Sequence, residues 1–224
     1  PDSSNGVTKY TIDQLIGSGI HGDVYRGHAE PSQERVAIKI FYPDPQHTMA
    51  LLTHLTHNST ALRNLNHPNI IKILAVDQED ERLRIVMEYV AGGSLRRLLV
   101  SEITISLRRL VRITLELADA LARAHHLDIL HGNLKPSNVL LAANGTPRLS
   151  DFGAVTLLKS ARSEPDLLSV TLSYTAPEIL CGELADSRAD IWALGALLYD
   201  MLTGQPPFHG KTVSQMLNAP PLPI

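Results

Sequence analysis

Glycines and a lysine near the start of the chain occur in an order that suits phosphate chemistry. Gly17, Gly19 and Gly22 are closely spaced between two predicted strands, and Lys39 follows on the third predicted strand. Glycines at this spacing let backbone N–H groups approach a polyphosphate closely, because no Cβ stands in the way. Taken alone the signal is weak, because glycines also form ordinary hairpins and a strand lysine is usually a solvated charge.

Four further segments follow these residues in a fixed order along the chain. They read HGNLKPSN at 131–138, DFG at 151–153, APE at 176–178 and DIWALG at 190–195. Together with the glycines and the lysine they form six signals in a fixed order, so chance agreement of the whole set is negligible.

Hydrophobic periodicity predicts the elements that position these residues. Short alternating or β-branched segments predict five strands, at 10–16, 23–28, 35–41, 70–76 and 83–89. One helix is expected at 48–65, where four leucines share a face. Beyond residue 94 the apolar period lengthens, which predicts one long helix at 189–202 and another whose apolar stripe is Leu107, Leu110, Val111, Leu117, Ala118 and Leu121.

This pattern predicts an α+β fold with two lobes. Residues 1–9 are expected to form a flexible N-terminal segment, 10–90 a small strand-rich lobe with one main helix, and 91–224 a larger, mainly helical lobe. Residues 87–93 are the natural connector between the two. Because clefts between domains are the usual place for a ligand, we expect the ligand of this chain between the lobes.

The ordered motifs resemble the signature set of eukaryotic-type Ser/Thr protein kinases, from about residue 10 to residue 207. The resemblance implies the bilobal protein-kinase fold, incomplete at its C-terminal end because the closing helices of the large lobe would follow residue 224. It also implies ATP and Mg²⁺ as cofactors. Lys135 and Thr171, the latter in TLSYTAPE at 171–178, are similar to the Ser/Thr branch of the family rather than the tyrosine branch.

The same resemblance implies a role for each residue of the nucleotide site. The three glycines would cover the phosphates, Lys39 would hold the α- and β-phosphates, and Asn138 with Asp151 would hold Mg²⁺. The adenine would be enclosed by Val24 and Ala37 above, Leu140 below, the gatekeeper Met87 and the connector from Glu88 to Val90.

Three positions depart from the family pattern. Asn133 stands where the family has the aspartate that accepts the proton of the substrate hydroxyl, and an amide has no useful basicity near neutral pH. Asn58 takes the place of the glutamate that pairs with Lys39, and no glutamate occurs between Glu34 and Glu79. Gly132 replaces the arginine that, in many kinases, pairs with a phosphorylated activation loop.

These departures leave three hypotheses. The first is a pseudokinase-like module that binds ATP–Mg²⁺, transfers phosphate weakly or not at all, and acts on a protein substrate or a regulatory protein partner. The second is an active Ser/Thr kinase in which Asn133 is an engineered replacement of aspartate, although Asn58 then needs its own explanation. The third is a small-molecule phosphotransferase, against which the APE and DIWALG motifs argue, because they shape a peptide-binding groove.

Composition excludes several other classes. The 224 residues carry a formal charge of −3, so nucleic acid is not expected as a partner. The longest apolar stretch is far shorter than the roughly 20 residues that cross a bilayer, so no membrane insertion is expected. Cys181 is the only cysteine, which favours a reducing, cytoplasmic location. The arginines at 108, 109 and 112 are interpreted as the solvated face of a helix.

Overall fold

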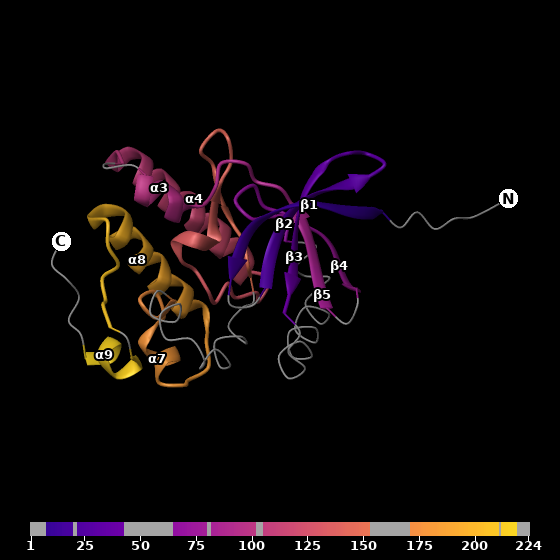
Figure 1. The fold of residues 1–224 in the computed structure, drawn as a ribbon. Coiled ribbons are helices and arrows are strands. Elements are labelled where there is room, and N and C mark those ends of the chain that lie inside the picture. Colours follow the sequence, from indigo (N-terminus) through magenta and orange to yellow (C-terminus); the bar gives the residue numbers. More distant parts are fainter. Residues whose placement is uncertain are drawn as a thin grey trace. The chain divides into compact units, whose positions relative to one another are not determined.

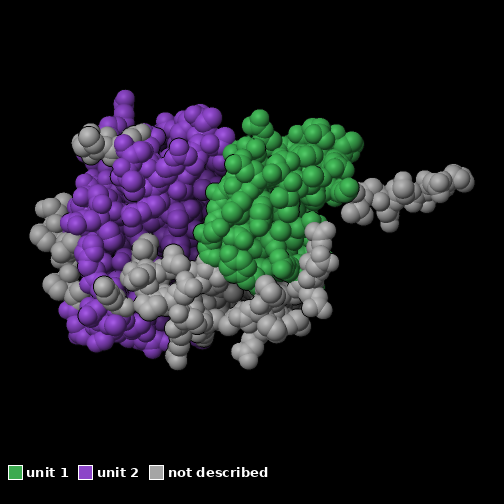
Figure 2. Space-filling model, viewed as in Figure 1, with its two compact units in different colours: residues 1–52, 72–89 green, residues 53–71, 90–224 purple. Residues whose placement is uncertain are grey.

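A computed structural model describes residues 8–19, 22–42, 65–79, 82–101, 105–152, 171–210 and 212–218. The chain divides into two compact units, one of residues 1–52 and 72–89 and the other of residues 53–71 and 90–224 (Figure 2). The helix predicted at 48–65 lies outside the described residues except for its last position. The proposed lobe boundaries at 9 and 90 remain a prediction.

The first unit is built on an antiparallel sheet of five strands in the order β1-β2-β3-β5-β4 (Figure 1). The strands are β1 (Lys9–Gly19), β2 (Gly22–Glu30), β3 (Arg35–Phe41), β4 (Ile73–Glu79) and β5 (Arg82–Glu88). Val36, Ile38 and Val86 are completely buried and pack with Ala29, so their alternation along neighbouring strands forms the core of this unit.

Four of the five predicted strands coincide with observed ones, but the fourth begins three residues later than predicted. Ile70 and Ile71, which the β-branched pattern assigned to this strand, belong to the second unit instead. Ile70 forms an isolated parallel bridge with Leu149, and the Ile71 N–H donates to the Leu149 carbonyl at 2.9 Å. Both isoleucines are buried there, so tertiary pairing rather than local propensity decides the strand boundary.

The helices within the described ranges belong to the second unit, and the two longest are α4 (Leu107–His125) and α8 (Ser187–Thr203) (Figure 1). Shorter elements are α3 (Leu95–Ser101), the 3₁₀ turn η1 (Pro136–Asn138), β6 (Val139–Leu141), β7 (Pro147–Leu149), α7 (Pro177–Leu180) and α9 (Val213–Asn218). The two long helices confirm the predicted ones, and the sheet followed by helices confirms the α+β class.

Capping residues explain where α4 and α8 begin and end. The Ser106 hydroxyl accepts from the Arg109 N–H at the start of α4, and the Asp186 carboxylate accepts from the Arg188 N–H at the start of α8. Helix α8 ends at Gly204, whose φ of 80° is the left-handed conformation that glycine adopts without strain. No helix within the described ranges is long and apolar enough to span a membrane.

The apolar stripe predicted on α4 divides into two faces. Leu110, Leu117 and Leu121 are buried and form its core-facing side. Leu107 and Val111 are exposed by 64% and 45%, so they do not contribute to the core.

Candidate active site

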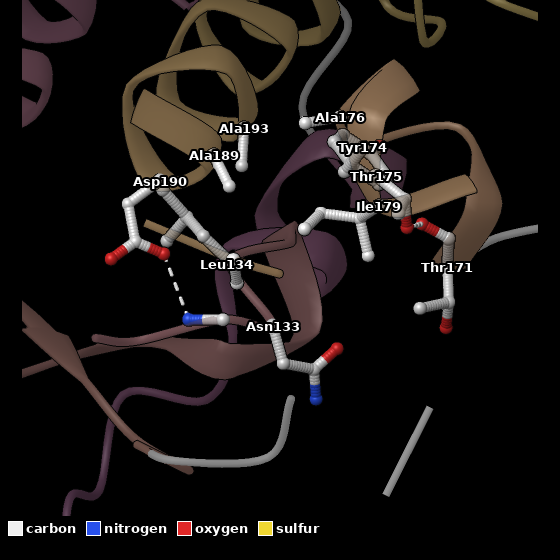
Figure 3. Close-up of a pocket in the computed structure, with 12 residues that line it drawn as sticks. Asn133, Leu134, Thr171, Tyr174, Thr175, Ala176, Ile179, Ala189, Asp190 and Ala193 are labelled. Atoms are coloured by element: carbon white, nitrogen blue, oxygen red, sulfur yellow. Dashed lines mark hydrogen bonds between the residues drawn. The ribbon is translucent and has the colours of Figure 1, made fainter. Parts of the chain in front are cut away.

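Asp190, in the first turn of α8, anchors the segment that carries the HGN motif. Its side chain is buried, and one carboxylate oxygen accepts from the Gly132 N–H at 2.8 Å (Figure 3). The other oxygen accepts from the His131 N–H at 2.9 Å and lies 2.8 Å from His125 Nε2. A buried carboxylate with three such neighbours is well satisfied, and it fixes the backbone that leads into position 133.

Asn133 lies immediately after this anchor, and hydrogen bonds with His131 and Asn138 hold its backbone. Its N–H donates to His131 Nδ1 at 3.2 Å, and its carbonyl accepts from Asn138 Nδ2 at 2.8 Å. Its side-chain Oδ1 is buried and has no hydrogen-bond partner among the described residues. Figure 3 shows the carboxamide turned away from α8. The loop therefore holds at this position an amide oxygen, which cannot take up a proton at neutral pH.

Lys135 and Thr171 are brought together although 36 positions separate them. Lys135 Nζ donates to Thr171 Oγ1 at 2.9 Å. The Thr171 carbonyl in turn accepts from Thr175 Oγ1 at 2.9 Å and from the Tyr174 N–H at 3.1 Å. The segment that leads into the APE motif is thereby joined to the loop that carries Asn133.

The β6–β7 hairpin places Asn138 and Asp151 at the same end of two paired strands. Val139 pairs with Leu149, so Asn138 lies opposite Ser150, whose N–H and hydroxyl donate to the Asn138 carbonyl at 2.9 and 3.1 Å. Asp151 follows with a φ of 62°, a left-handed conformation that is uncommon outside glycine but tolerated by aspartate. Gly153, the last residue of the DFG motif, lies outside the described residues.

His131 and Phe152 pack on each other. Their ring centroids are 4.6 Å apart with the planes inclined by 52°. His131 is fully buried, and this burial lowers the pKa of its imidazole, although the negative charges of Asp190 and Asp151 act in the opposite direction.

The first unit arranges its predicted nucleotide residues through strand register. Val24 pairs with Gly17 on one side and with Lys39 on the other, and Ala37 pairs with Met87. Lys39 Nζ also lies 5.1 Å from the centroid of the Phe41 ring.

Among the predicted glycines, Gly22 has the clearest structural reason for its identity. Its φ is 153°, and a Cβ there would lie 2.1 Å from the Ile40 carbonyl oxygen. The positions of Gly17 and Gly19 are less crowded, with nearest atoms 4.0 and 3.7 Å from a built Cβ.

The remaining predicted residues belong to the segments that end the first unit and begin the second. Glu88 ends β5, and its carboxylate accepts from the Lys72 N–H at 3.1 Å. Val90 is half-buried at the start of the second unit, and Leu140 is half-buried on β6, where it bridges to Ser94. Their joint role around an adenine stays a prediction, and so does the role of Asn58, which lies outside the described residues.

Sequence reasoning missed a buried polar pair behind the APE motif. The Tyr174 hydroxyl donates to Asp200 Oδ2, and both side chains are inaccessible to solvent. Burial raises the pKa of the Asp200 carboxyl, while the Tyr174 hydrogen bond and the charges of Arg96 and His209 partly offset this effect. The pKa of Tyr174 is raised as well, by burial and by its bond to Asp200. No motif or periodicity in the sequence signals this pair.

A small cavity lies between the Asn133 loop, the segment around the APE motif and α8 (Figure 3). Its volume is ≈ 30 Å³, about the space of a water molecule. Ala189 and Ala193 face it from α8, and Ile179 faces it from α7. The short alanine side chains leave this gap, which is too small for a substrate side chain.

Comparison with known proteins agrees with this geometry. The family model described as "Protein kinase domain" matches residues 10–220. The chain is 32% identical to serine/threonine-protein kinase PrkC of Bacillus subtilis over 91% of the chain and 32% of that protein. It is 30% identical to Aurora kinase C of Mus musculus over 93% of the chain and 75% of that protein. It is also 30% identical to the probable serine/threonine-protein kinase CPE1738 of Clostridium perfringens, again spanning less than a third of the relative's length.

Proposed function

The chain belongs to the protein kinase family as a domain of the Ser/Thr type, and we propose that it binds ATP–Mg²⁺ but transfers phosphate to proteins weakly or not at all. The observation that carries this proposal is the pairing of an intact scaffold with an amide at position 133. Asp190 holds the loop and Lys135 bonds Thr171, yet the side chain presented by the loop cannot act as a base.

In this proposal the first unit supplies the contacts to the nucleotide phosphates and to one face of the adenine. Gly22 supports the assignment as a backbone position that admits no side chain, since a Cβ there would lie 2.1 Å from the Ile40 carbonyl oxygen. Lys39 supplies the positive charge for the α- and β-phosphates. The other residues assigned in this unit are Gly17, Gly19, Val24, Ala37, Met87 and Glu88, and the second unit contributes Val90 and Leu140.

The proposed Mg²⁺ ligands are Asn138 and Asp151, whose oxygen donors suit this hard cation. The fit rests on the β6–β7 hairpin, because Ser150 ties the Asn138 backbone to the residue that precedes Asp151. When bound, Mg²⁺ supplies charge neutralisation at the phosphate oxygens. The chain's own contribution is to hold these two side chains at one end of a paired hairpin.

Weak phosphotransfer follows from what Asn133 and Asn58 lack. General-base assistance typically contributes about 10²–10⁴-fold to a rate, and an asparagine provides none. At position 58 an amide could still accept a hydrogen bond from Lys39, but it lacks the negative charge with which a carboxylate would form an ion pair. Positioning and electrostatics still favour transfer, so a residual rate is compatible with the proposal.

A second candidate is an active Ser/Thr kinase whose native residue at 133 is aspartate. The Lys135–Thr171 hydrogen bond of 2.9 Å favours this second candidate, because the contact is expected in a loop that takes part in phosphate transfer. The two candidates share the nucleotide site and differ in the rate of transfer alone.

Calorimetric titration with ATP tests the binding part of the proposal. We expect Lys39→Ala and Asp151→Asn each to weaken ATP affinity in the presence of Mg²⁺, and the Asp151→Asn effect to shrink when Mg²⁺ is omitted. Lys9→Ala is the matched control, because Lys9 is an exposed lysine of the same unit, with 77% of its side chain accessible. Unchanged affinity in both site variants would refute the assignment.

A further inference from the structure

The second unit carries a groove that contains none of the residues assigned above. Its lining comes from α4, from Leu98 of α3, from Gly92, which precedes α3, and from the turn at 142–145 that joins β6 to β7. The groove has a volume of ≈ 940 Å³, at the upper end of the range for ligand pockets. Nothing in the proposed nucleotide or phosphotransfer function uses it.

Backbone hydrogen bonds hold the part of the groove formed by Gly92, Leu141 and the turn. The Gly92 N–H donates to the Leu141 carbonyl at 3.0 Å, and the Leu141 N–H donates to the Gly93 carbonyl at 2.8 Å. The turn itself is closed by the Gly145 N–H, which donates to the Ala142 carbonyl at 2.8 Å. A groove held in this way is formed before a ligand arrives, so binding requires little ordering of this surface.

One side of the groove is an exposed apolar stripe on α4. Val111 and Leu115, which line the groove, are exposed by 45% and 65%, and Leu107 one turn earlier is exposed by 64%. The three residues are spaced by four, so they lie on one face of the helix. Contiguous exposed apolar residues of this size mark a contact surface more often than isolated ones do.

Among the described residues, the ionisable ones that line the groove are all arginines. Arg108, Arg109 and Arg112 contribute to this lining, and no described aspartate or glutamate does. Arg112 also pairs with Glu116, its Nε lying 3.2 Å from Oε1, which offsets part of one charge. The first turn of α4 adds the partial positive charge of a helix N-terminus at Ser106. This surface is therefore locally positive although the chain carries a formal charge of −3.

We propose that this groove binds an acidic linear segment of a partner protein. Carboxylates of the segment would meet the arginines at 108, 109 and 112, and its apolar side chains would cover Val111 and Leu115. Charge complementarity selects an acidic partner, and the apolar stripe selects a peptide over a small anion. The arginines, which the sequence alone assigns to a solvated helix face, thereby acquire a role in recognition.

Selection from a displayed library of random peptides tests the proposal without knowledge of the partner. Peptides that bind the chain are tested against Arg108→Glu and Leu115→Asp, with Arg82→Glu on β5 as the matched charge reversal in the other unit. We expect the selected peptides to be net acidic with interspersed apolar residues. Arg108→Glu should weaken the affinity of a selected peptide by about tenfold or more, because it exchanges an attraction for a repulsion, while Arg82→Glu should leave it unchanged.

Two outcomes of this selection would overturn the proposal. The first is that the selected peptides carry no excess of acidic residues. The second is that acidic peptides bind the Arg108→Glu and Arg82→Glu variants equally well. Binding of the chain to vesicles of phosphatidylserine and phosphatidylcholine without binding to acidic peptides would assign the surface to lipid instead. Sedimentation of the chain as a dimer that Leu115→Asp dissociates would assign it to a second copy. ATP affinity should be the same in Arg108→Glu, so failure here is distinguishable from failure of the nucleotide assignment.

Discussion

Removal of the Asp190 carboxylate should destabilise the helical unit more than any exposed substitution on the same helix. Asp190→Ala leaves the buried N–H of His131 and that of Gly132 without the carboxylate that now accepts from them at 2.9 and 2.8 Å. Hydrogen bonds to charged groups contribute about 1.5–3 kcal/mol each, so the two together predict a loss of about 3–6 kcal/mol. For a chain of this size such a loss lowers the melting temperature by roughly 6–24 °C.

Urea unfolding followed by tryptophan fluorescence and circular dichroism measures this loss. The single tryptophan, Trp192, lies on α8 and stacks on Phe208 at 5.5 Å, so its emission reports on the helical unit. Asp186→Ala is the control, because this residue caps the same helix from an exposed position and should cost about 0.5–2 kcal/mol. Asp190→Asn, which keeps one acceptor oxygen, should fall between the two and remains measurable if Asp190→Ala does not fold. Equal stability of Asp190→Ala and Asp186→Ala would refute the anchoring role.

Two further predictions concern the sheet and the pair behind the APE motif. Gly22→Ala should destabilise the chain by roughly 1–3 kcal/mol in urea unfolding, because its Cβ would meet a backbone oxygen at 2.1 Å with φ at 153°. Gly17→Ala, with its nearest atom at 4.0 Å, should cost clearly less, and equal costs would contradict the crowding argument. Burial raises the pKa of Asp200, so the folded state holds this proton more tightly than the unfolded state does. The stability that this proton gives is present at low pH and is lost as pH rises through the folded-state pKa. Asp200→Asn, which stays neutral and can still accept from Tyr174, should therefore gain stability relative to the parent chain as pH rises above the ordinary pKa of aspartate, about 4; a constant difference would contradict it.

The local pattern of apolar residues was sufficient to predict most of the strands and helices, because apolar residues recur with a different period in a strand than in a helix. It misplaced the start of β4, because Ile70 and Ile71 are paired with Leu149, a partner far along the chain. It also grouped Leu107 and Val111 with the buried face of α4, because an exposed leucine and a buried one look alike in sequence.

The candidate site also contains residues that the sequence predicts and residues that it does not. The order of the motifs identified Asn133, Asn138, Asp151 and Asp190, because their chemistry is distinctive and their spacing is fixed. The bond between Tyr174 and Asp200 could not be predicted in the same way, because neither residue stands out by type or period and only folding buries them together. The arginines of the α4 groove were visible in the sequence, but their shared lining of a groove depends on the β6–β7 turn.

Phosphotransfer from labelled ATP to a generic basic protein tests the central claim most directly. The chain is compared with its Asn133→Asp variant and with an Asn133→Asp, Asn58→Glu double variant, after ATP binding has been verified for all three. The account predicts that the unmodified chain is silent or at least about 10²-fold slower than the double variant. A rate for the unmodified chain equal to that of both variants would contradict it, because Asn133 would then not limit transfer.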